Sequence, residues 1–237
     1  MTNYDKFSNF YDAVMGDRAK TADLLSDFIH ESNPEAKNVL ELACGTGAIL
    51  KYLAKDYEVS GLDLSKGMLD VAKKEVPQAK LYQQSMVDFT IPEKFDVILC
   101  VFDSINHLTK FSDWKKLFAS AQKHLNEKGV FIFDINTEKK LERVIKETPG
   151  VREFDKNLMV MNVTDAGRGL SNWNVKVFEH KKGKSYELHE ENISEVSFPK
   201  EKILDVLKSL YRSVKTIDTD KTHPKKKGDR FFFICKK

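Results

Sequence analysis

A glycine-rich turn and an acidic residue downstream of it are the residues of this chain best suited to hold a small ligand. The turn, ACGTG at 43–47, consists of small residues that let a ligand lie directly on the backbone. Sixteen residues after Gly47 comes Asp63, whose carboxylate can accept hydrogen bonds from both hydroxyls of a ribose. The residue types and their spacing therefore predict a site for a nucleotide-like ligand.

The segments around the turn would place it at the edge of a sheet. Residues 38–42 form a short apolar run, as expected for a strand buried in a parallel sheet. An amphipathic stretch follows and predicts a helix over 46–55, whose N-terminus points back at the turn. A second predicted strand, 57–62, ends directly before Asp63. Strand, turn and helix start together make a cradle of the nucleotide-binding kind.

The glycine spacing distinguishes between classes of nucleotide. A dinucleotide site needs G-x-G-x-x-G, because the third glycine lets the helix pack closely and leaves room for a pyrophosphate. Here Leu50 occupies the third position, and Glu41 lies inside the strand end. An NAD(P)-linked oxidoreductase is therefore disfavoured but stays open, as does a glycine turn that binds no ligand.

The segment VLELACGTG at 39–47 resembles the first motif of the class I S-adenosylmethionine-dependent methyltransferases, and GLDLS at 61–65 resembles their second motif. The resemblance runs over most of the chain. It is strongest to small-molecule methyltransferases with a β-sheet lid inserted after the fifth strand, a group that includes sugar N,N-dimethyltransferases. It implies that S-adenosyl-L-methionine is the cofactor and that a nitrogen or oxygen of a small molecule accepts the methyl group. A protein that binds the cofactor or its product without catalysis is the alternative.

The order of the predicted elements agrees with such a fold. After a helical first thirty residues, strands alternate with helices as far as residue 136, which predicts a doubly wound α/β sheet of Rossmann-like type. From 151 to 197 extended runs alternate without a helical period, which predicts an antiparallel meander. Two closing strands, 214–219 and 230–235, would end a seven-stranded sheet in an antiparallel hairpin, as in the resembled family.

We therefore expect a cofactor-binding core formed by 1–148 and 198–237. Residues 149–197 would form an inserted antiparallel β lid over the acceptor site. Trp173, Met159 and Met161 suggest an apolar wall on one face of this lid.

The resemblance also implies roles for individual residues. The backbone of the turn would approach the methionine part of the cofactor, Asp63 would hold the ribose, and Tyr11 would cap the cofactor carboxylate. The third family motif, usually Gly-Asp-Met, is Gln84-Ser85-Met86 here, so any hydrogen bond that Ser85 accepts from adenine lacks the charge of the usual aspartate. Packing in the core is the alternative for Met68, and an aromatic helix face is the alternative for Tyr11. The implied cofactor-binding residues are Tyr11, Ala43, Cys44, Gly45, Gly47, Asp63, Leu64, Met68, Ser85, Met86, Cys100 and Val101.

An amine or hydroxyl acceptor must lose a proton, which calls for a base near pH 7. In an extended strand His189 shares a face with Glu187 and Glu191, either of which could orient it and raise its pKa. His189 is the first candidate and His107, which follows the fourth predicted strand, is the second. A solvated charged strand is the alternative explanation for His189. Other candidates at the sheet edge are Asp103, Asn106, Asp134 and Asn136.

Composition limits the partners. The net charge of +3 is too small to imply nucleic acid, and no apolar run approaches the length of a membrane span. The three cysteines have unrelated spacings, without metal-ligand or disulfide patterns, which fits a reducing cytoplasm. We expect a cytoplasmic enzyme that uses no metal and acts on a small molecule rather than on nucleic acid or a membrane. A homodimer is compatible with the sequence.

Overall fold

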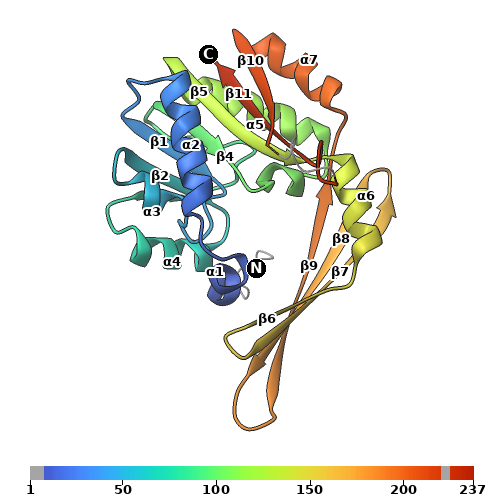
Figure 1. Cartoon of the computed structure of the whole chain (residues 1–237). Helices are drawn as coiled ribbons and strands as arrows, with labels where there is room; N and C mark the ends of the chain where they lie inside the picture. The colour runs from blue at the N-terminus through green and yellow to red at the C-terminus, as the bar shows by residue number, and fades with distance from the viewer. Residues whose placement is uncertain (1–7, 220–224) are drawn as a thin grey trace.

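A seven-stranded, mostly parallel sheet forms the centre of the molecule (Figure 1). The computed structural model describes residues 8–219 and 225–237. The strands of this sheet are β1 (Asn38–Leu42), β2 (Glu58–Asp63), β3 (Lys80–Gln83), β4 (Phe95–Cys100), β5 (Leu125–Asn136), β10 (Ser213–Asp218) and β11 (Arg230–Lys236). They lie in the order β10-β11-β5-β4-β1-β2-β3, and β11 runs antiparallel to both of its neighbours while the other pairs are parallel. The predicted α/β sheet that ends in an antiparallel hairpin is confirmed.

Helices cover both faces of this sheet. One face carries α2 (Ala19–Ser32), α3 (Leu50–Leu53) and α4 (Lys66–Glu75), and the other carries α5 (Phe111–His124) and α7 (Lys200–Leu210). The remaining helices are α1 (Ser8–Met15), α6 (Glu138–Glu147) and a 3₁₀ helix, η1 (Ser104–His107). None of the helices in the described ranges is long and apolar enough to cross a membrane.

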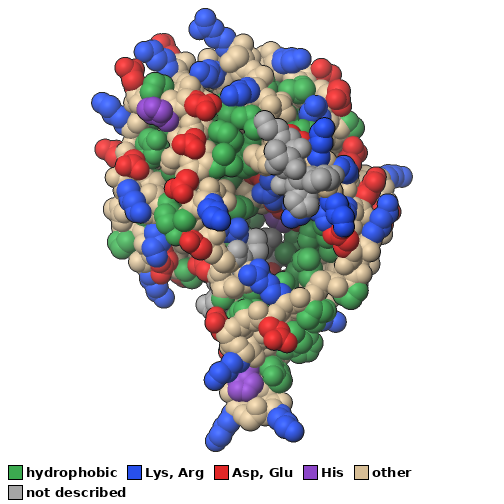
Figure 2. Space-filling view, in the orientation of Figure 1, with side chains coloured by type: hydrophobic (Ala, Val, Ile, Leu, Met, Phe, Trp, Pro, Cys, Tyr) green, Lys and Arg blue, Asp and Glu red, His purple; other side chains and the backbone are tan. Residues whose placement is uncertain are grey.

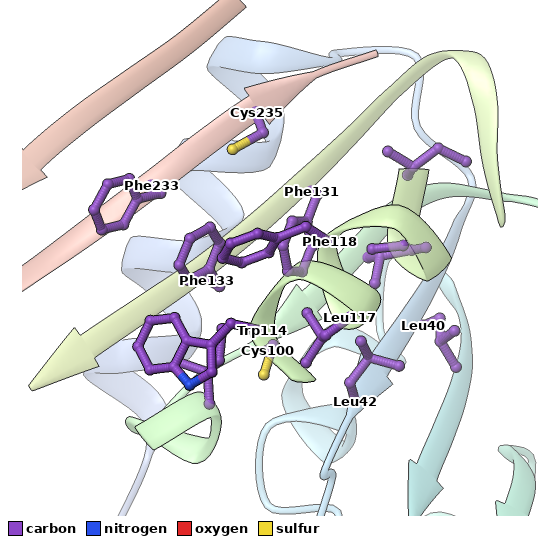
Figure 3. Close-up of a cluster of buried hydrophobic side chains, with 14 of the residues drawn as sticks. Leu40, Leu42, Cys100, Trp114, Leu117, Phe118, Phe131, Phe133, Phe233 and Cys235 are labelled. Atoms are coloured by element: carbon purple, nitrogen blue, oxygen red, sulfur yellow. The ribbon is translucent and has the colours of Figure 1, made fainter. Parts of the chain in front are cut away.

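Aromatic rings fill the core on the α5 side of the sheet (Figure 3). The ring of Phe133 stacks on Phe131 and on Phe233, with centroids 4.9 and 4.8 Å apart. Trp114 is fully buried and its indole N–H donates to the Leu108 carbonyl at 2.8 Å. Burial of each large apolar side chain contributes about 1.5–3 kcal/mol, so the strands that carry the functional loops rest on a rigid base.

A second sheet, antiparallel and four-stranded, stands apart from the first and projects away from it (Figure 1). It consists of β6 (Gly150–Phe154), β7 (Asn157–Gly167), β8 (Leu170–His180) and β9 (Tyr186–Val196), paired in sequence order. The turn between β7 and β8 has positive φ at Gly167, Arg168 and Gly169, where glycine is tolerated without strain. The meander predicted for 151–197 is therefore confirmed.

Two predicted helices differ from the observed ones. The helix expected over 46–55 is reduced to α3, because Gly45 and Gly47 have φ of +54° and +78° and keep the turn out of helical geometry. The helical N-terminal region breaks at Gly16, with φ of +73°, into α1 and α2. The first seven residues of the predicted N-terminal helix lie outside the described residues.

Candidate functional site

A cavity of about 790 Å³ lies where the carboxyl ends of the parallel strands face the second sheet. This edge of an open α/β sheet is the place where such folds bind ligands, and the volume falls within the range of about 300–1,000 Å³ that small-molecule sites occupy. Figure 2 shows a hollow between the core and the second sheet, with hydrophobic side chains along the sheet. The lining comes from the loops after β1, β2, β3 and β4, from α1 and α6, and from the second sheet.

Asp63, the last residue of β2, connects two of these loops. Its Oδ2 accepts a hydrogen bond from Gly45 N at 2.9 Å, and its Oδ1 accepts one from Ser65 N at 2.8 Å. Ser65 in turn caps α4, because its Oγ accepts from Met68 N at 3.2 Å. The carboxylate is thus fixed between the glycine turn and the start of a helix, on the wall of the cavity.

The two glycines of the turn have different surroundings. A Cβ built on Gly45 meets nothing within 4 Å, and Gly45 lines the cavity, so this position is open to a ligand. A Cβ on Gly47 would lie 3.3 Å from Ala72 Cβ and from Val76 Cγ2. Gly47 therefore lets the turn pack closely against α4 and does not line the cavity.

An apolar slot adjoins Asp63. Leu64 is 56% exposed although it is large and hydrophobic, and it lines the cavity together with Met68 and Met86. Ser85 lies beside Met86 on the same wall, and its Oγ accepts a hydrogen bond from Val87 N at 3.3 Å. Tyr11 reaches the cavity from α1, and burial raises the pKa of its hydroxyl to about 12.

The structure thus brings eight of the twelve predicted cofactor residues to one cavity. Cys44, Gly47, Cys100 and Val101 are not among the lining residues. Cys100 and Val101 are buried where β4 ends, and the next two residues, Phe102 and Asp103, form the wall in their place. The eight predicted residues in the lining are Tyr11, Ala43, Gly45, Asp63, Leu64, Met68, Ser85 and Met86.

A buried carboxyl behind the turn shows what kind of ligand these residues suit. Glu41, in β1, is 3% exposed, and its Oε2 has no hydrogen-bond partner among the described residues. Burial, together with the nearby Asp63 carboxylate, raises the pKa of Glu41 well above its usual value. A cationic ligand group at the turn would compensate this carboxyl, Asp63 suits ribose hydroxyls and the apolar slot suits a flat base. The residues therefore fit the cofactor.

The opposite end of the cavity is held by an arginine between two aspartates. Arg230 Nη2 lies 2.5 Å from Asp103 Oδ1, and its Nη1 lies 2.8 Å from Asp134 Oδ2. Asp134 is fully buried, and burial raises its pKa to about 6 despite Arg230. Burial also opposes ionisation of Asp103, but Arg230, Lys140 and His107 together hold its pKa below the usual value. Asp103 and the preceding Phe102 have φ of +53° and +58°, a strained geometry of the kind that clusters at functional sites.

Sequence reasoning missed one buried acid here. Glu195, on β9, is 5% exposed and lines the cavity, and its Oε2 accepts a hydrogen bond from Asn136 Nδ2 at 3.2 Å. Burial, and secondly the charge of Asp103, raise the pKa of Glu195 to about 8. The period of two along β9 was the available signal, since it places Glu195 on the face that carries His189.

Asn106, one of the polar candidates at the sheet edge, connects the two sheets. Its Nδ2 donates to the carbonyls of Asn136 at 2.9 Å and Val196 at 2.8 Å, and its Oδ1 accepts from Asn136 N at 3.0 Å. Because these bonds engage both ends of the fully buried amide, Asn106 holds the end of β9 against β5.

The structure separates the two candidate histidines. His107 lines the cavity, and burial lowers its pKa, so the ring is neutral at pH 7. His189 is not among the lining residues. Its Nε2 lies 2.8 Å from Glu179 Oε2, and its ring lies 5.0 Å from that of Phe10.

His189 also belongs to a cluster of three residues that could hold a metal ion. Ligand atoms of Glu179, Glu187 and His189 lie within 4.8 Å of one another. Lys181 Nζ lies 2.8 Å from Glu179 and 2.9 Å from Glu187, so both carboxylates already share an ion pair with this lysine.

The inner face of the second sheet gives the cavity an apolar wall. Trp173, Met159 and Met161 all line it, in the arrangement expected from the sequence. Val14 of α1 packs against Met159 in a small separate core. On its other side α1 is tied to the glycine turn, because Thr46 Oγ1 donates to Asp12 Oδ1 at 2.8 Å. The N-terminal helix therefore closes the cavity between the two sheets.

Comparison with known proteins gives consistent results. A family model described as a methyltransferase domain matches residues 39–129. The chain is 30% identical, over 99% of its length and 97% of the relative, to a protein named Putative methyltransferase YqeM from Bacillus subtilis (strain 168). It is 34% identical, over 55% of either chain, to the dTDP-3-amino-3,4,6-trideoxy-alpha-D-glucopyranose N,N-dimethyltransferase of Streptomyces venezuelae. A crystal structure of an S-adenosylmethionine-dependent methyltransferase from Clostridium acetobutylicum ATCC 824 superposes with a TM-score of 0.86 at 28% identity, over 99% of each chain.

Proposed function

The chain belongs to the class I S-adenosylmethionine-dependent methyltransferases, and from that premise we propose that it methylates an amino group of a small, sugar-like molecule. One observation carries the proposal. A single cavity joins Asp63, the carboxylate that we expect to bind the ribose, to a second compartment walled by the second sheet. The relative that dimethylates a dTDP-amino sugar supports the choice of acceptor.

The residues of the cofactor end bind and orient. When bound, S-adenosylmethionine supplies a methyl group on a positively charged sulfur, so the enzyme has mainly to align the acceptor with it. We propose that Asp63 accepts hydrogen bonds from the ribose, and that Leu64, Met68 and Met86 enclose the adenine with Ser85 at its edge. The open backbone at Gly45 receives the methionine part, and Tyr11 closes over it.

The second compartment, which we call the acceptor end, favours methyl transfer over a protein that only binds the cofactor. A protein that only binds the cofactor needs no further compartment, whereas this cavity continues past Phe102 to Trp173 and Arg152. The second sheet therefore acts, in this proposal, as the lid formed by 149–197 over the acceptor. Of the two predicted histidine bases, His107 is the one with access to the acceptor, because His189 is outside the lining.

The setting of the enzyme is proposed from its cysteines. Cys44, Cys100 and Cys235 are all free and buried, which supports a reducing cytoplasm. The homodimer stays a prediction, which light scattering after gel filtration measures directly.

Isothermal titration with S-adenosylmethionine and S-adenosylhomocysteine tests the function. We expect micromolar dissociation constants for the wild type and binding about 100-fold weaker for Asp63→Ala, since each hydrogen bond to a carboxylate is worth about 1.5–3 kcal/mol. Asp70→Ala is the matched control, because Asp70 is an exposed acid on α4 whose ion pair, among the residues that the structure describes, is with Lys66. Absence of binding by the wild type would contradict the proposal. Circular dichroism confirms that Asp63→Ala is folded, and Asp63→Asn serves if it is not.

A methyl-acceptor screen then separates the enzyme from a cofactor-binding protein. dTDP-3-amino-3,4,6-trideoxy-α-D-glucopyranose and simpler amino sugars are the first acceptors to test. Appearance of S-adenosylhomocysteine that depends on the acceptor supports transfer. Tight cofactor binding without transfer to any acceptor favours the non-catalytic alternative.

A further inference from the structure

Glu195 is a buried acid that faces the acceptor compartment. It lies at the end of β9 nearest the core, only 5% exposed, and its side chain lines the same cavity as Trp173 and Asp63. Its backbone is fixed as well, because Ser171 Oγ donates to the Glu195 carbonyl at 3.2 Å. A carboxyl in such a place is destabilising unless it has a partner or a use.

The amide of Asn136 sets the orientation of this carboxyl. Asn136 Oδ1 accepts hydrogen bonds from Lys140 Nζ at 2.6 Å and from Arg230 Nη2 at 3.2 Å. Since both cations donate to the oxygen, the NH₂ side of the amide must face Glu195, and Nδ2 donates to Glu195 Oε2 at 3.2 Å. One carboxyl oxygen is therefore held by a neutral donor that cannot take a proton.

The charges around Glu195 leave it free to exchange a proton near neutral pH. Asp103 on the loop after β4 opposes its ionisation, whereas Lys140 on α6 and Arg230 on β11 favour it. Arg230 is engaged by Asp103 and Asp134, and Lys140 donates to Asn136. Burial outweighs the two cations and raises the pKa of Glu195 to about 8. The same burial lowers the pKa of His107, which makes the histidine the weaker base.

We propose that Glu195 receives the proton of the acceptor amine. The inference rests on the proposed methyltransferase function and adds to it the group that takes the proton. The ammonium form of the acceptor breaks an N–H bond and the proton forms an O–H bond with the Glu195 carboxylate. The freed nitrogen lone pair then forms the N–CH₃ bond while the C–S bond breaks and its electron pair stays on the sulfur. The products are a methylated ammonium and a neutral thioether.

The match of acidities explains why an amine is the fitting acceptor. An amine beside electron-withdrawing groups titrates near 8, as an α-amino group does. Transfer of its proton to Glu195 is therefore close to balanced. Once the carboxyl has released this proton to solvent, it can take the proton of the methylated ammonium in the same way. A hydroxyl is far less acidic, so its proton would not pass to this carboxyl.

The first test needs no acceptor. Carboxyl ¹³C resonances of glutamate are followed by NMR against pH in the complex with S-adenosylhomocysteine, for the wild type, Glu195→Gln and the control Glu187→Gln. Glu187 is on the same face of β9 but is exposed and outside the cavity lining. We expect one signal, missing only in Glu195→Gln, with a midpoint near 8. A midpoint below 6 would overturn the proposal.

The second test measures transfer to dTDP-3-amino-3,4,6-trideoxy-α-D-glucopyranose and to the same sugar nucleotide with a hydroxyl in place of the amine. We expect methylation of the amine only, with kcat/KM rising towards pH 8. Glu195→Gln should lower kcat/KM about 100-fold and abolish its pH dependence. Glu187→Gln should keep the wild-type kcat/KM and pH dependence, and all variants should bind S-adenosylhomocysteine equally. A Glu195→Gln enzyme with the wild-type rate and pH profile would overturn the proposal. Failure of the wild type to bind S-adenosylmethionine would instead remove the methyltransferase function on which it rests.

Discussion

The two ends of the cavity are built from different kinds of sequence. The cofactor end comes from short segments that directly follow β1, β2 and β3, and it relies on backbone geometry at Gly45 and on a single carboxylate, Asp63. The acceptor end is a network of buried and partly buried charged and polar side chains from the loop after β4 and from β5, α6, β9 and β11. Its central contact joins Asp103 to Arg230, which are 127 residues apart in the chain.

This difference indicates how each end is maintained. The cofactor end depends on turns that fold locally, so a substitution there acts on one loop. The acceptor end depends on charges that compensate one another inside the protein, and removal of one partner leaves the others buried without compensation. We therefore expect the acceptor end to be the more sensitive to single substitutions.

Arg230→Met should have the largest effect. It removes the guanidinium that lies within 2.8 Å of both Asp103 and Asp134, and leaves the buried Asp134 and the partly buried Asp103 without their ion-pair partner. We expect the free energy of unfolding to fall by about 3–5 kcal/mol at pH 8. Burial already raises the pKa of Asp134 to about 6, and loss of Arg230 raises it further. The loss should therefore shrink towards pH 5, where Asp134 is protonated in the variant.

Urea denaturation at several pH values measures this effect. Arg212→Met is the matched control, since Arg212 is exposed and its backbone N–H, which donates to Lys236 O, is unaffected by the change. It should stay within about 0.5 kcal/mol of the wild type. Equal stability of Arg230→Met and Arg212→Met would show that the acceptor end does not depend on its ion pairs.

The same difference explains what the sequence could and could not predict. The ligand turn at 43–47, Asp63 and the strand order were accessible, because they follow from glycine spacing and from alternating apolar runs. The histidine at 189 was singled out because carboxylates flank it in sequence. Its actual partner, Glu179, lies on the neighbouring strand, and cross-strand register cannot be deduced from one strand alone.

The charged network of the acceptor end could not be predicted from the sequence for a related reason. Asp103, Asn136 and Asp134 could be placed at the sheet edge from their positions after strands. Glu195 and Arg230 look like ordinary surface charges in the sequence, and only the packing of the second sheet and of β11 brings both to the side chain of Asn136. Gly47 illustrates the opposite case. Its spacing in the sequence predicts contact with the ligand, whereas in the structure it packs closely against Ala72.

Glu195→Gln should stabilise the protein at alkaline pH. The pKa of Glu195 is raised to about 8 in the folded state, against about 4.3 in an unfolded chain. The favourable contribution of the protonated carboxyl is complete below pH 4 and is lost as pH rises through 8. Glutamine does not titrate, so the variant should gain about 3–4 kcal/mol over the wild type between pH 5 and pH 8.

Thermal or urea unfolding of both proteins across this range measures the gain. Glu187→Gln provides the comparison, because Glu187 is exposed. The difference in free energy of unfolding between this variant and the wild type should not change with pH. Parallel curves for Glu195→Gln and the wild type would mean that Glu195 is ionised in the folded protein at neutral pH.

The smallest effects distinguish two glycines of the cofactor end. Alanine at either position must adopt a positive φ, at a cost of about 1–2 kcal/mol. At Gly47 the new Cβ also lies 3.3 Å from Ala72 and Val76, so Gly47→Ala should lose more stability but keep its affinity for S-adenosylhomocysteine. At Gly45 the new Cβ enters the open cavity, so Gly45→Ala should bind about tenfold more weakly, or about 1.4 kcal/mol. Calorimetry measures the affinity for S-adenosylhomocysteine, and thermal unfolding measures the stability. Weaker binding by Gly47→Ala than by Gly45→Ala would mean that Gly47 and not Gly45 approaches the cofactor.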